Sequence, residues 1–150
     1  MRAMRSVIAG LLLVAMPAGA VPGAEAPPVR FVAVHVYIDA KTVPLAAYQF
    51  DFTCAAQTAR IVGLEGSPHP AFAEPPHYDP KAMTGHRVIA AAFSIHDAPD
   101  LPTGQVRIAT VHLQVDAGPA PRFDVRLVTA GDWQGRRINA EISYEIGVTP

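Results

Sequence analysis

The chain of 150 residues is poor in cysteine, in charged residues and in aromatic side chains. Its single cysteine, Cys54, cannot form an internal disulfide, which leaves a free thiol, an intermolecular link or a buried small hydrophobe. Because no basic residue stands close to Cys54 in the sequence to lower its pKa, the sequence favours the buried thiol. Only 17% of the residues are charged and 50% are hydrophobic, so the chain can bury a core and is not disordered.

A sustained helical period is also missing, and 15 prolines with 11 glycines favour short strands and turns. Apolar and polar residues alternate with period two, which is typical of half-buried strands. We therefore predict one all-β domain over residues 30–150, a jelly-roll or immunoglobulin-like β-sandwich of about nine strands in two sheets. Seven of those strands are well marked in the sequence, at residues 30–40, 46–53, 59–65, 86–95, 105–115, 122–128 and 137–146.

The segment Pro44–Ala56, "PLAAYQFDFTCAA", places Tyr48, Phe50 and Phe52 on one face of a strand. The intervening polar residues occupy the other face, so the three aromatics are predicted to lie in the core. Residues 86–95 are apolar enough to be buried on both faces for part of their length. In the last strand, Ile138, Ala140, Ile142 and Tyr144 are expected to point inward. The proline-rich residues 66–80 predict a long loop or an excursion along a sheet edge.

The N-terminus has the three parts of a secretory signal peptide. Arg2 and Arg5 precede a short apolar run, and Ala18-Gly19-Ala20 is a cleavage site. Residues 1–20 are therefore predicted to direct export to the periplasm or the extracellular space, and residues 21–29 to form a flexible Pro/Ala linker. The apolar run is short for a membrane span, and cleavage would remove it. Loss of the two arginines changes the net charge from −1 to −3, which argues against nucleic acid as a partner.

The sequence contains no motif of a catalytic or metal site. The six histidines lack H-E-x-x-H or close H-x-H spacing, and no serine lies in a G-x-S-x-G elbow. We therefore expect a protein that is not an enzyme and needs no metal or cofactor. Trp133, in a turn, and Tyr37, opposite the core face of its strand, are the candidates for stacking on sugar rings. The alternative for Trp133 is a lid over one end of the core.

Read as a unit, residues 34–67 resemble the bacterial cohesin domain, a relative of the carbohydrate-binding-module sandwiches. The resemblance lies in Leu45-Ala46-Ala47-Tyr48-Gln49-Phe50-Asp51-Phe52-Thr53 and continues in His86–Ile95, Leu101–Gly104, Ile108–Val115 and Asp132–Ile138. It covers residues 31–146 with order and spacing kept. Where the family has Tyr-Asp-Pro, this chain has Cys54-Ala55-Ala56.

The resemblance implies a nine-stranded jelly-roll that works by binding and holds no cofactor of its own. Cohesins bind dockerin modules, usually on polysaccharide-degrading enzymes, through one sheet face and the loops beside it. For this chain it implies a dockerin-like or other protein partner, contacted by residues 59–65, by residues 86–95 and by the turn that follows. From those segments the contact candidates are Arg60, Arg87, Ser94, His96 and Asp97. A carbohydrate-binding module that holds polysaccharide through Trp133 or Tyr37 is the alternative.

Overall fold

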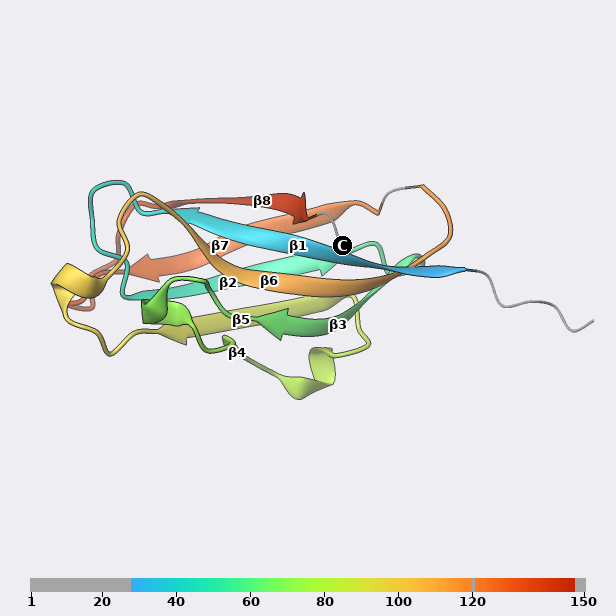
Figure 1. Cartoon of the computed structure of the whole chain (residues 1–150), viewed down its shortest axis with the longest axis horizontal. Coiled ribbons are helices and arrows are strands. Elements are labelled where there is room, and N and C mark those ends of the chain that lie inside the picture. The colour runs from blue at the N-terminus through green and yellow to red at the C-terminus, as the bar shows by residue number, and fades with distance from the viewer. Residues whose placement is uncertain (1–27, 120, 148–150) are drawn as a thin grey trace, which may run out of the picture.

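The computed structural model describes residues 28–119 and 121–147, so the predicted signal peptide and all but the last two residues of the linker lie outside it. The described chain is all-β, with three short 3-10 turns and no α-helix (Figure 1). Its strands are β1 (Val29–Asp39), β2 (Ala47–Cys54), β3 (Ala59–Glu65), β4 (His77–Tyr78), β5 (Arg87–Phe93), β6 (Gln105–Asp116), β7 (Phe123–Gly131) and β8 (Glu141–Gly147).

The strands form two antiparallel four-stranded sheets, ordered β3-β6-β1-β8 and β4-β5-β2-β7. The expected all-β class is confirmed, but the described residues form eight strands where about nine were predicted. The proline-rich residues 66–80 supply only β4, which has two residues. Pro75 and Pro76 precede it and Pro80 follows it, and none of them can donate a ladder hydrogen bond.

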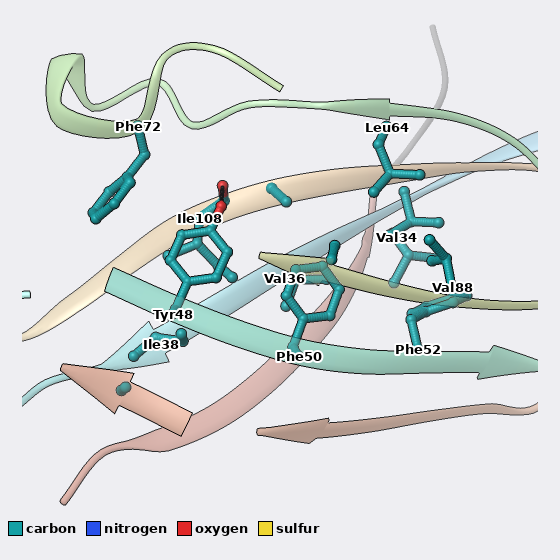
Figure 2. Close-up of a cluster of buried hydrophobic side chains, with 14 of the residues drawn as sticks. Val34, Val36, Ile38, Tyr48, Phe50, Phe52, Leu64, Phe72, Val88 and Ile108 are labelled. Carbon is teal, nitrogen blue, oxygen red and sulfur yellow. Dashed lines mark hydrogen bonds between the residues drawn. The ribbon is translucent and has the colours of Figure 1, made fainter. Parts of the chain in front are cut away.

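The aromatic residues of β2 form the centre of the core. Figure 2 shows Tyr48, Phe50 and Phe52 pointing from β2 toward Val34 and Val36 of β1. The two phenylalanines are fully buried, and Tyr48 is 2% exposed. Burying each such side chain contributes about 1.5 to 3 kcal/mol relative to leaving it in water. The alternation in the sequence therefore predicted this core correctly.

A β-bulge in β6 is closed by side chains from elsewhere in the fold. Val36 of β1 faces Ala109 and Tyr37 faces Arg107, so Ile108 has no partner on β1. The hydroxyl of Tyr48 crosses the core and donates to the Ile108 carbonyl over 3.0 Å. The hydroxyl of Ser67 donates to the neighbouring carbonyl, that of Arg107. The carbonyls of Arg107 and Ile108 thus each accept a hydrogen bond from a side-chain hydroxyl at the bulge.

The end of the chain differs from the prediction in two respects. The last strand begins at Glu141, not near residue 137, because Ile138 instead bonds back to Ala130 in a turn. Tyr144, expected inside, is 39% exposed. The Tyr144 side chain does point to the core side of the sheet, since Tyr144 pairs with buried Val36. β8 is an edge strand, however, so only part of the ring is covered.

Candidate functional site

The outer face of the sheet β4-β5-β2-β7, here called the outer face, is apolar at one end and charged at the other. The buried apolar residues of β2 point inward, so its alternate residues point outward together with their register partners on β5 and β7. These outward positions are Ala47, Gln49, Asp51 and Thr53 on β2, Arg87, Ile89, Ala91 and Phe93 on β5, and Asp124, Arg126, Thr129 and Gly131 on β7.

The apolar end of the outer face is hollowed because its residues are small. Ala47, Ala91 and Gly131 line a depression of about 410 Å³. Phe93 and His77 form one wall, with ring centroids 6.3 Å apart and planes 19° from parallel. The depression has room for a side chain of a partner.

A second hollow, of about 440 Å³, adjoins the first at Phe93 and Ala47. Trp133, Ile95 and His96 lie along it. Phe93 is 68% exposed, Ile95 89% and Trp133 57%. The sequence predicted that residues 86–95 would be buried on both faces for part of their length. This was wrong, because the outward side chains of Ile89 and Phe93 are 44% and 68% exposed. Three large apolar side chains around one hollow are unusual on a free surface and indicate a contact site.

The charged end of the outer face is organised by Asp51, whose side chain is only 8% exposed. Arg87 donates to it from Nε over 3.0 Å and from Nη2 over 2.7 Å. Arg126 donates from Nη2 over 3.1 Å. The hydrogen bonds from Arg87, opposed by burial and assisted by Arg126, lower the pKa of Asp51. Both arginines therefore bond to this one buried carboxylate, and Asp124 of β7 lies on the same face at this end.

The five predicted contact residues do not form one cluster. Ser94, His96 and Asp97 lie together in the turn after β5, where the Ser94 hydroxyl is 3.0 Å from His96 Nδ1. Arg87 starts the same strand, so it lies about 20 Å from that turn at the usual rise per residue. Arg60 is exposed on β3, which belongs to the other sheet.

The two sugar-stacking candidates are also separated. Trp133 lies in the turn after β7, beside the outer face. Tyr37 lies on β1 of the other sheet, half-buried, where burial and then Glu145 raise its pKa. The two rings therefore cannot form one platform, and Trp133 is not a lid, since 57% of it is exposed.

The solvent-facing side of the sheet β3-β6-β1-β8 carries polar side chains that lie close to one another. His35 Nδ1 lies 2.9 Å from the Thr110 hydroxyl, and His112 Nε2 lies 3.1 Å from Glu65 Oε1. Burial, and then Arg107, lowers the pKa of His35, which keeps the ring neutral at pH 7. Among residues 28–119 and 121–147, no three His, Cys, Asp or Glu side chains gather closely enough to hold a metal ion.

Cys54 is buried, as predicted, and its pKa is raised by that burial. Its thiol lies 3.7 Å from the Ala59 carbonyl, within the core. The described part of the chain has no helix of the length and apolar character that crossing a membrane requires.

Sequence reasoning identified the turn residues and Trp133, but it missed Phe93, His77 and the small residues of the first hollow. Phe93 could not have been found, because residues 88–93 are apolar on both faces and the pattern does not show which face is exposed. Nor could the hollow, since Ala47, Ala91 and Gly131 meet only through strand pairing. No family model, curated protein or solved structure matches the chain. Its own geometry therefore carries the functional proposal.

Proposed function

We propose that this chain is an exported, non-catalytic protein-binding module with a cohesin-like jelly-roll fold. Its docking surface is the outer face of β4-β5-β2-β7 together with the turns that carry Ile95 and Trp133. The partner is a protein, dockerin-like or of another kind, that serves polysaccharide degradation or another extracellular assembly.

The observation that carries the proposal is the group of exposed apolar side chains around the two hollows. Phe93, Ile95 and Trp133 stay in water when the chain is alone, and covering them gains the free energy of removing apolar area from water. Aromatic anchors beside pockets, surrounded by polar residues, are typical of protein interfaces. Here the Ser94–His96 turn and Arg137 provide that polar surround.

The first hollow and the two exposed arginines of the outer face define the chemistry of the partner. An aliphatic or aromatic side chain of the partner fills the hollow over Ala47 and Ala91. A carboxylate of the partner faces Arg87 and Arg126, whose side chains are 54% and 69% exposed beside Asp51. Such complementarity adds orientation and association rate more than affinity.

The contact is built on Arg87, Ser94, His96 and Asp97. Arg60 lies on the other sheet and is not part of this contact.

The test compares proteins retained from the exported fraction of the source organism by three immobilised chains. These are the wild type, the double variant Phe93→Ala/Ile95→Ala, and the control Val62→Ala, which shortens a 38% exposed side chain on the other sheet. We expect a partner that the wild type and the control retain equally and the double variant releases. If all three chains retain the same proteins in the same amounts, or none, the proposal is wrong.

Exposure of Trp133 beside the second hollow favours one further function, carbohydrate binding. An indole ring stacks on the apolar face of a sugar. Affinity electrophoresis in a panel of polysaccharides tests it. Retardation that is abolished in Trp133→Ala and kept in Tyr37→Ala would support binding at this ring, and equal mobility in every gel would exclude it.

A further inference from the structure

Three of the four sheet edges in the described residues are shielded against pairing with another strand. On β3, the backbone N–H of Ile61 donates to Gly85 and its carbonyl accepts from Thr84. β4 is two residues long and flanked by prolines. On β7, Arg137 Nη2 donates to the carbonyl of Val128 over 2.9 Å, and Gly131 bridges to Arg137. Proteins usually prevent an edge strand from pairing with another chain by covering the edge, by keeping it short or by blocking it with a side chain.

The fourth edge, β8, has no such protection. It pairs with β1 over seven residues in unbroken register, from Ala33 opposite Gly147 to Asp39 opposite Glu141. The strand contains no proline, lysine, arginine or bulge, and no described strand pairs with its other side. A regular edge of this length is a template for a further strand.

The hydrogen-bonding groups on that free edge follow from the ladder. The backbone N–H of Ala40 donates to Gly104 on the β6 side of β1. Because successive residues of a strand direct these groups to opposite sides, the odd-numbered residues of β1 face β8. Their partners on β8 are also odd-numbered. The N–H and C=O groups of Ile142, Tyr144 and Ile146 therefore point away from β1, to the side on which no described strand pairs with β8.

The same three residues carry the apolar side chains of β8. They pair with Ile38, Val36 and Val34, so they face the core side of the sheet. Being at the edge, Tyr144 remains 39% exposed and Ile146 54% exposed. The edge thus offers free backbone groups and incompletely covered apolar side chains at the same positions.

We propose that this edge pairs with the β8 strand of a second copy of the chain, antiparallel and centred on Tyr144. Tyr144 then faces its own equivalent, and Ile142 faces Ile146 of the other copy at both ends. Each of these three pairs exchanges two backbone hydrogen bonds, about six in all. The contact is two-fold symmetric, and it joins the two β3-β6-β1-β8 sheets into one continuous sheet.

The charges of β8 select this register. On the opposite face of the strand, Glu145 meets Ser143 of the other copy, and Glu141 meets Gly147. A register centred on Ser143 instead would place Glu141 directly opposite Glu145 twice, and like charges at that spacing are destabilising. A second copy is therefore an occupant whose charges fit. The outer face of β4-β5-β2-β7 remains free in the dimer, so this contact does not depend on the proposed function.

Sedimentation equilibrium of the purified chain over a concentration series gives the first measurement. The expected mass rises toward twice the 15.9 kDa of one chain. Single cysteines then test the register under mild oxidation. Tyr144→Cys should form a covalent dimer, because facing Cα atoms about 5.5 Å apart suit a disulfide. Ile146→Cys should not, since the two copies of that residue lie about 14 Å apart along the strands. The wild type, whose buried Cys54 is 3% exposed, is the baseline.

Ser143→Lys provides an independent variant on the exposed face. The lysine would meet Glu145 of the other copy in the proposed register and strengthen dimerisation several-fold. In the register centred on Ser143 it would meet itself and weaken dimerisation. A monomeric mass at every concentration, equal cross-linking at positions 144 and 146, or weaker dimerisation of Ser143→Lys would each overturn the proposal.

Discussion

Replacing Tyr48 by phenylalanine removes one hydroxyl and leaves the ring in place. The ring keeps its edge contact with Phe72, 5.2 Å between centroids, and its contact with Phe50. The lost bond is the one to the Ile108 carbonyl, which has no partner on β1 at the bulge. A net hydrogen bond contributes about 1 kcal/mol, and an unsatisfied buried carbonyl costs up to about 3 kcal/mol. We expect Tyr48→Phe to lower the free energy of unfolding by about 1 to 2 kcal/mol.

The same substitution has a pH dependence with a defined sign. Burial raises the pKa of Tyr48, so the folded chain keeps the phenol neutral at a pH where the unfolded chain ionises it. The wild type therefore loses stability above pH 10, by about 1.4 kcal/mol per pH unit from this group. Tyr48→Phe has no such loss. The deficit of the variant should be constant below pH 10 and shrink above it.

Urea unfolding at pH 7 and at steps between pH 9 and 11 measures both effects. At pH 7 the expected loss corresponds to a melting temperature lower by about 3 to 6 °C. Tyr144→Phe is the matched control, because the Tyr144 ring is part-exposed at an edge, and its variant should stay within about 0.5 kcal/mol of the wild type. If Tyr48→Phe is as stable as that control, the bond to Ile108 does not hold the bulge. If its deficit does not change with pH, burial does not keep the phenol neutral.

Three further results are expected. Gly66→Ala places a methyl group against the backbone carbonyl of Ala73, so it should lower the free energy of unfolding in urea by more than about 2 kcal/mol. An unchanged urea midpoint would contradict the close approach of Gly66 to Ala73. Because Arg87 lowers the pKa of Asp51 in the folded chain, the carboxylate stabilises the fold above pH about 4 and loses this effect in more acidic solution. Acid should therefore unfold the wild type with a steeper pH dependence than Asp51→Asn. Equal acid profiles of the two chains would refute this. Buried Cys54 should react with a thiol reagent in urea but only slowly in the native chain, and rapid native labelling would show that the core opens there.

The fold class could be predicted because period-two alternation is a local property of the sequence. Tyr48, Phe50 and Phe52 alternate with polar residues, and that fixes which side of β2 faces the core. Alternation does not show where a strand lies within its sheet. Tyr144 has the inward-facing position that its pattern indicates, yet it is part-exposed because β8 is an edge.

Features that depend on strand pairing could not be predicted from the sequence. Asp51 was assigned to the polar face correctly, but its burial depends on Arg87 and Arg126, which are 36 and 75 residues away in the sequence. The candidate contact residues failed to group for the same reason, since neighbouring segments of sequence enter different sheets. Arg60 and Arg87 are separated in this way, while Phe93 and Trp133 are brought together.

The position of β1 between β6 and β8 has a kinetic consequence. Of the described strands, β1 is the first to leave the ribosome, and both of its partners come late, with Ala33 opposite His112 and Gly147. Contacts of such long sequence separation form slowly, because a large loop must close before any of them is made. The growing chain therefore cannot complete the β3-β6-β1-β8 sheet until β8 has been synthesised. Until then β1 stays available to whatever factors bind unfolded chains.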